Sequence, residues 1–179
     1  MKNEAYQRLM DNLCDIVAEE QAKLGYMKEP IRLYYPLSSL NHFFDKDASV
    51  DEMQQKLSEF ESFAYDKFGE VEITHKGERF CFFLSERATE YVHENGGQNQ
   101  FIFDLVALLA KHGTVMEEVE ALFAKQKDAY EIEKMNHGEF DYMIHFVDSK
   151  DKYLYCFKDE GCHIIYHRFL PEDYEDLGL

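Results

Sequence analysis

The sequence predicts an α+β protein of two lobes, each with helices followed by antiparallel strands. Apolar residues recur at helical spacing over residues 3–24, and a second helical stripe follows a capping-box pattern at 49–52. From residue 129 the apolar period changes to two, which is typical of strands. Between these regions lies the most apolar run of the chain, 101–110, which we expect to form a buried central helix.

Composition and charge narrow the classes of partner. Nineteen Lys and Arg against 36 Asp and Glu give the 179-residue chain a formal charge of −17, so its average surface repels nucleic-acid phosphates and anionic lipids. As a helix, the run 101–110 would be about 15 Å long, roughly half a bilayer core. No secretory signal follows Met1. We expect the protein to be cytoplasmic and not to enter a membrane. We also expect it to bind another protein and to need no cofactor.

The first lobe is assigned to residues 1–97. A capping box starts at Ser49, and the apolar stripe behind it runs to Gly69, which predicts a long helix. The lobe also contains a first helix over 3–24, a strand over 31–35 and a short helix over 37–44.

A hairpin is predicted over residues 71–84, with Lys76-Gly77 as its two-residue turn. In that register one face of the hairpin is buried and the other is mostly exposed to solvent. The buried face holds Val71, Ile73, Phe80 and Phe82, and the solvent-exposed face holds Glu72, Thr74, Arg79 and Cys81. Ser85 is expected to cap a short helix that ends near Asn95, and Gly96-Gly97 marks the boundary between the lobes.

The second lobe, residues 98–179, begins with the apolar helix, which Gly113 ends. A second capping box, Thr114 to Glu117, predicts another helix. An antiparallel meander of four strands follows, and the acidic tail from Pro171 is expected to be loosely held. The strands are expected over 130–135, 140–147, 153–157 and 162–169.

The order of elements recurs in the two halves. In each, a capping box leads into a helix, then a strand, a Gly-Glu turn and an aromatic strand. Helix, corner, helix and hairpin is the order of a winged-helix unit, and the run from Phe82 to Val92 resembles the last wing strand and closing helix of such proteins. The winged-helix-like part begins at about residue 31, and Ala88 stands where such proteins usually carry Gly.

Short blocks along nearly the whole chain resemble an uncharacterised bacterial family known only as a domain of unknown function. That resemblance implies no activity, cofactor or partner. The blocks are Leu33-Tyr-Tyr-Pro, Arg79-Phe-Cys-Phe, Glu90-Tyr-Val-His, Glu139-Phe-Asp-Tyr, Tyr153-Leu-Tyr-Cys-Phe and Tyr166-His-Arg-Phe.

Histidines and cysteines gather in the predicted meander. With turns at 149–150 and 158–161, Cys156 lies beside Met143 and His163, and one face holds His145, Cys156, His163 and His167. The opposite, aromatic face is expected to pack on the helix at 101–110. Cys156 and His163 are the only candidate metal ligands, but His145 and His163 lie on the order of 12 Å apart in this register, too far to share one zinc ion. No metal site is therefore assigned.

Thiol catalysis is the other enzymatic reading of these residues. Cys156 could pair with His163, or Cys81 with His75, but neither pair brings an oxyanion site, and Cys81 would lie opposite Glu72. We interpret the four cysteines as buried free thiols. No Gly-rich phosphate loop, H-E-x-x-H or G-x-S-x-G pattern occurs, so no catalytic residue is assigned.

The sequence favours a non-catalytic cytoplasmic module that binds or regulates another protein through its acidic or aromatic surface. Two alternatives remain. A winged-helix transcription regulator would need a basic groove, whereas the helices that would enter DNA begin with carboxylates and only His75, Lys76 and Arg79 make the wing basic. An acidic immunity-type inhibitor would block a basic toxin by charge complementarity. A Cys/His hydrolase is the least favoured class.

Overall fold

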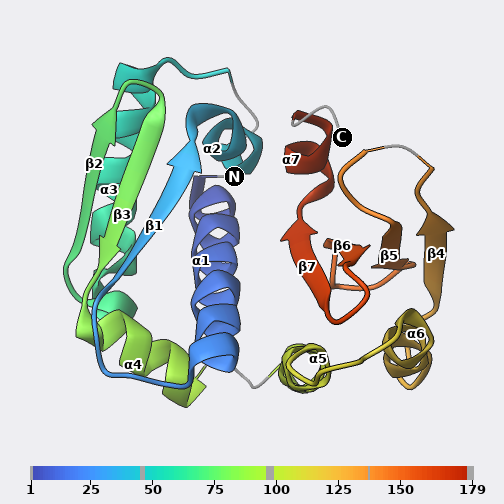
Figure 1. The fold of residues 1–179 in the computed structure, drawn as a ribbon. Helices are drawn as coiled ribbons and strands as arrows, with labels where there is room; N and C mark the ends of the chain where they lie inside the picture. Colours follow the sequence, from blue (N-terminus) through green and yellow to red (C-terminus); the bar gives the residue numbers. More distant parts are fainter. Residues whose placement is uncertain (1, 45–46, 96–98, 137, 177–179) are drawn as a thin grey trace. The chain divides into compact units, whose positions relative to one another are not determined.

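The computed structural model describes residues 2–44, 47–95, 99–136 and 138–176 (Figure 1). The chain divides into two compact units, Met1–Asn99 and Gln100–Leu179, each with its own antiparallel sheet. The α+β prediction is confirmed. The predicted boundary, Gly96-Gly97, lies outside the described residues.

The first unit follows the predicted order of elements closely. The elements are α1 (Lys2–Leu24), β1 (Ile31–Pro36), α2 (Leu37–Phe44), α3 (Val50–Phe68), β2 (Val71–Lys76), β3 (Arg79–Leu84) and α4 (Glu86–Asn95). The sheet has the order β1-β3-β2, so the strand before the long helix pairs with the second strand of the hairpin.

Both ends of α3 are fixed as its sequence predicts. The Ser49 hydroxyl accepts from the Glu52 backbone N–H at 3.4 Å, and the Glu52 carboxylate accepts from the Ser49 N–H at 2.9 Å. This reciprocal pair satisfies two of the donors that a helix leaves unpaired at its start. Gly69 ends the helix at φ +70°, a region that favours glycine.

One face of the first sheet is buried against the helices. Phe80, Phe82 and Leu84 of β3 are fully buried, and the Tyr35 ring of β1 contacts Phe82 edge-on at 5.2 Å. The predicted turn was wrong by one residue and the register by two, because the turn is Gly77-Glu78 and Ile73 therefore lies opposite Phe82. Since the shift is even, every predicted side chain keeps its face.

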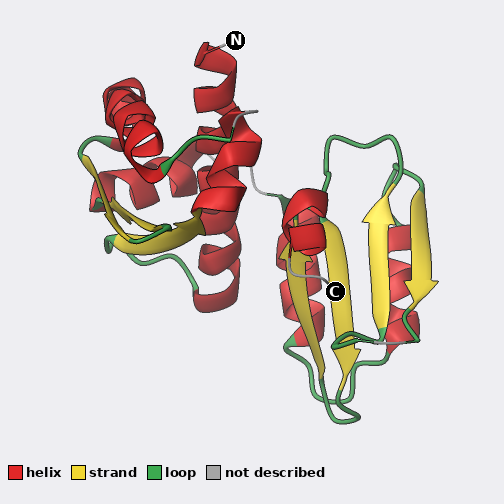
Figure 2. Cartoon of the chain, turned by 90° about the horizontal axis from the view of Figure 1, so that it is seen from above, coloured by secondary structure: helices red, strands yellow, loops and turns green. Residues whose placement is uncertain are grey.

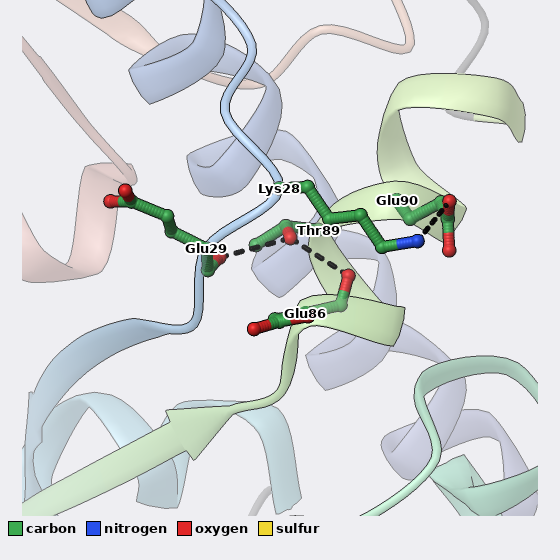
Figure 3. A network of polar contacts seen from close by, with 5 residues as sticks. All are labelled: Lys28, Glu29, Glu86, Thr89 and Glu90. Carbon is green, nitrogen blue, oxygen red and sulfur yellow. Dashed lines mark hydrogen bonds and ion pairs between the residues drawn. The ribbon is translucent and has the colours of Figure 1, made fainter.

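The segment between α1 and β1 is held on α4 by side-chain and backbone bonds (Figure 3). The Thr89 hydroxyl lies 3.0 Å from the Glu29 carbonyl and 2.9 Å from that of Glu86, and Lys28 pairs with Glu90 at 2.7 Å. Gln21 of α1 donates to the Thr89 carbonyl at 2.9 Å. These contacts fix where β1 enters the sheet.

The second unit contains two helices, four strands and a short last helix. These elements are α5 (Gln100–Leu109), α6 (Met116–Ala124), β4 (Tyr130–Lys134), β5 (Tyr142–Phe146), β6 (Leu154–Asp159), β7 (Ile164–Phe169) and α7 (Pro171–Asp176). The predicted meander is confirmed by the strand order β4-β5-β6-β7. Helices of this unit lie behind one face of the sheet (Figure 2).

Aromatic rings make the core of the second unit. Phe123 of α6 is fully buried, and its ring centre lies 4.8 Å from Phe101 of α5 and 5.3 Å from Tyr155 of β6. The aromatic sheet face therefore packs on the helix at 101–110, as predicted. That helix is less enclosed than expected, because Asp104 and Ala107 are exposed.

The second unit differs from its prediction at three places. The N-cap of α6 is Val115, whose N–H donates to Glu118, while the Thr114 hydroxyl donates to the Leu108 carbonyl. The strand beside the β4–β5 hairpin follows it in the chain, whereas β1 precedes its hairpin in the first unit, so the two halves repeat only in part. The described part of the predicted loose tail, residues 171–176, forms α7 instead.

None of the helices in the described ranges combines the length and the apolar character that crossing a membrane requires.

Candidate functional site

The exposed face of the first sheet carries the most unusual group of side chains. Alternation along the strands turns these residues away from the core, and the pairing of β1 and β2 with β3 brings them into rows. We call this surface the outer sheet face. It consists of Arg32, Tyr34, Glu72, Thr74, Lys76, Arg79, Cys81 and Phe83.

Two arginines of this face lie over aromatic rings. The Arg79 guanidinium is 4.7 Å from the centre of the Tyr34 ring, and that of Arg32 is 4.8 Å from the centre of Phe83. Tyr34 is 53% exposed although tyrosine rings are usually largely covered. Stacking restrains each guanidinium plane and leaves its N–H groups free to bind a planar anion such as a carboxylate.

A shallow hollow of about 500 Å³ lies beside Tyr34 and Arg79 on this face. Tyr34, Thr74 and Cys81 line it together with three cationic or titratable side chains, His75, Lys76 and Arg79. Within the described ranges no carboxylate pairs with Arg32, Lys76 or Arg79, although acids outnumber bases 36 to 19 in the sequence. A group of unpaired cations around a hollow is a surface on which an anionic group can be bound.

The helix that a winged-helix protein would use to read DNA has the opposite charge. Most charged side chains of α3 are acidic, with only Lys56 and Lys67 to oppose them. The acidic residues of α3 are Asp51, Glu52, Glu59, Glu61 and Asp66. A helix of this composition repels a phosphate backbone, so the basic character of the unit belongs to the sheet and not to this helix.

The candidate metal ligands Cys156 and His163 are not brought together. Cys156 lies on β6, between Met143 and His167, whereas His163 lies before the start of β7. The predicted pairing of β5 with β6 is confirmed and that of β6 with β7 was wrong by four residues. Nowhere in the described part of the chain do three or more His, Cys, Asp or Glu residues gather as metal ligands would.

The predicted thiol pairs are likewise absent. Cys81 lies opposite Thr74 and Tyr34, and the His75 ring nitrogen lies 3.1 Å from the Gly77 carbonyl on the turn. Burial raises the pKa of Cys156 to about 11, so this thiol holds its proton at neutral pH. The prediction of four buried thiols was wrong for Cys162, which is exposed; Cys14 and Cys81 are half-buried.

Sequence reasoning missed half of the outer sheet face. The solvent-exposed face of the hairpin was predicted with Glu72, Thr74, Arg79 and Cys81. The four residues missing from it were Arg32, Tyr34, Lys76 and Phe83. The alternation of Ile31–Pro36 already puts Arg32 and Tyr34 on one side of a strand. The missing information was that β1 pairs with β3, since a strand separated from its neighbour by two helices and another strand carries no local sign of its pairing.

Comparison with known proteins adds a family but no activity. No curated protein and no solved structure matches the chain, so the winged-helix likeness stays a prediction. One family matches residues 6–178, nearly the full length, and is described as "Domain of unknown function, E. rectale Gene description (DUF3877)". The chain therefore belongs to this uncharacterised family, which the short blocks along its sequence had indicated.

Proposed function

We propose that this chain is a non-catalytic cytoplasmic module that binds an acidic segment of another protein on its outer sheet face. The observation that carries the proposal is a set of three cations, Arg32, Lys76 and Arg79, that have no carboxylate partner in the described part of the chain. Lys76 and Arg79 line a hollow of about 500 Å³, and Arg32 lines a smaller hollow on the same face. In a chain of formal charge −17, such a group is a local exception to the surface charge.

A protein segment fits this surface better than DNA does. The net charge and the acidic α3 repel a long phosphate backbone. A short acidic segment meets the local field of the outer sheet face, where three cations outnumber the carboxylate of Glu72. Tyr34 and Phe83 offer apolar contact area beside those cations, and aromatic and arginine side chains are enriched where proteins bind one another.

The proposal is tested by titrating a fluorescent peptide rich in Asp and Glu into the full chain. Replacing Arg32, Lys76 and Arg79 together with Gln is expected to weaken binding roughly tenfold, because exposed ion pairs contribute about 0.2–1 kcal/mol each and about 1.4 kcal/mol is tenfold in affinity. Binding to the natural chain should weaken as salt is raised.

The matched control replaces three exposed lysines of the second unit, Lys111, Lys125 and Lys127, with Gln. It changes the net charge by the same amount and should leave peptide binding unchanged. Equal losses in the two triple variants would contradict the proposal, as would binding of duplex DNA in preference to the peptide. Preference for a Lys-rich peptide, unaffected by the sheet variant, would favour an immunity-type inhibitor instead.

A further inference from the structure

The turn between β6 and β7 joins a thiol, an imidazole and a carboxylate in one hydrogen-bonded chain. The Cys162 Sγ lies 3.1 Å from His163 Nδ1, and His163 Nε2 lies 3.2 Å from a carboxylate oxygen of Glu160. All three side chains are open to solvent. Sequence reasoning paired His163 with Cys156 and left Cys162 among the buried thiols.

Backbone bonds hold this turn in one shape. Glu160 N–H donates to the His163 carbonyl at 3.0 Å, and Gly113 N–H donates to the Cys162 carbonyl at 3.1 Å from the loop after α5. Gly161 has φ +83°, which a side chain would strain, and its N–H donates to Asp159 at 2.8 Å. The backbone that carries the side chains of Glu160, Cys162 and His163 is therefore restrained at both ends of the turn.

We propose that Cys162 is a thiol-exchange site at which the His163–Glu160 pair takes the thiol proton and a low-molecular-weight disulfide forms a mixed disulfide with Sγ. With the His163 proton on Nε2 and hydrogen-bonded to Glu160, Nδ1 is free to accept the proton of Cys162. A nucleophile beside a base that a third group orients is the arrangement from which activated thiols are recognised.

The exchange balances without any further reactant. The Cys162 thiolate attacks one sulfur of the disulfide, so that a new S–S bond forms while the old one breaks. The departing thiolate takes the proton that His163 had accepted and leaves as a thiol. Cys162 is oxidised and the departing half of the disulfide is reduced.

The other thiols of the chain provide internal comparisons. Cys156 is fully buried, and Cys14 and Cys81 are only half-buried. In addition, none of these three sulfur atoms has a histidine within hydrogen-bond distance among the described contacts. Selective reaction at Cys162 would therefore have two causes, the solvent exposure of its thiol and the neighbouring base His163. A variant that removes only the base separates these two causes.

The test is the rate at which the full chain forms mixed disulfides with oxidised glutathione and with cystamine at pH 7, followed by mass spectrometry of its peptides. Cys162 should react first, and Cys162→Ser should abolish the fast phase. His163→Asn is expected to slow Cys162 about tenfold, because an unassisted thiol is only a few per cent thiolate at pH 7 and the lower nucleophilicity of an assisted thiolate offsets part of that gain.

Glu160→Gln should slow the same reaction by a smaller factor and keep the turn folded, and free imidazole should restore part of the rate lost in His163→Asn. The matched control is the second His–Glu pair of this unit, His145 and Glu131, whose ring nitrogen and carboxylate lie 3.5 Å apart. His145→Asn should leave the Cys162 rate unchanged. An unchanged rate in His163→Asn, or faster labelling of Cys81 than of Cys162, would overturn the proposal.

Discussion

The position at which β1 enters the first sheet depends on one side chain, that of Thr89. It is 4% exposed, and its hydroxyl joins the α1–β1 segment to α4 through the Glu29 carbonyl. Thr89→Val keeps the shape of the side chain but removes the hydroxyl that bonds to the Glu29 carbonyl. We expect the free energy of unfolding to fall by about 1–2 kcal/mol in urea titrations.

The matched control for this change is Thr74→Val, the same substitution at an exposed position of β2. It should alter the free energy of unfolding by less than about 0.5 kcal/mol. Equal losses at the two positions would show that the hydrogen bond of Thr89 contributes nothing beyond the change of residue type.

One half-buried thiol and one buried thiol, Cys14 and Cys156, make stability fall at alkaline pH. Burial, with smaller contributions from Asp11 and Asp15, raises the pKa of Cys14 to about 12, and burial raises that of Cys156 to about 11, both from 9.0. Because the folded state binds these protons more tightly, the stabilisation is complete below pH 9 and is lost as the pH rises from 9 towards 12. Each thiol contributes at most about 1.4 kcal/mol per pH unit in its window.

The measurement is the free energy of unfolding in urea between pH 7 and pH 11. The double variant Cys14→Ala, Cys156→Ala should be less stable at pH 7 but should lose stability more slowly above pH 9 than the natural chain does. The exposed Cys162→Ser should keep the natural slope. If the double variant and the natural chain decline in parallel, the two thiols are not what links stability to pH.

At the scale of the element, the N-terminus of α3 depends on the Ser49–Glu52 capping box. Ser49→Ala removes the acceptor for the Glu52 N–H and is expected to cost about 1 kcal/mol, measured by thermal or urea unfolding. Ser62→Ala, the same change at an exposed position inside the same helix, should be neutral or slightly stabilising because alanine is the better helix former. A comparable loss at Ser62 would contradict the assignment of the cap.

The elements themselves could be predicted from sequence because their signals are local. Helical spacing and Ser49 located α3, and the change to period two located β4 to β7. Strand registers were less predictable: the β2–β3 register was two residues out and the β6–β7 register four. Even shifts preserve the buried face and are weakly opposed by hydrophobic burial, so the faces were right and the partners were not.

At the scale of the whole molecule, each unit has its own core. Phe123 joins the rings of Phe101, Tyr155 and Phe157 within the second unit. Phe123→Ala is expected to cost about 3–5 kcal/mol of that unit's stability. Hydrogen exchange should show faster opening of β4 to β7 while β1 to β3 keep their protection.

A suitable control is Val115→Ala, which trims a side chain that is 47% exposed in the same unit. It should leave the exchange of both sheets nearly unchanged. If Phe123→Ala accelerated exchange equally in the two sheets, the units would unfold together and the division into separate cores would be wrong.

The candidate site was harder to predict than the fold because it needs contacts between distant segments. Arg32 and Arg79 are 47 positions apart in the numbering, and only the pairing of β1 with β3 places them on one face. The total charge concealed the site as well, since a net charge of −17 carries no sign of three cations grouped on one face of a sheet.

The most direct test of the outer sheet face is to follow the backbone amide signals of the full chain by NMR while the acidic peptide is added. We predict that the shifts concentrate on β1, β2 and β3, centred on Tyr34, Thr74 and Cys81, and that they fade as salt is raised. Shifts that concentrate on α3 or on the second unit, with the outer sheet face unchanged, would contradict the account.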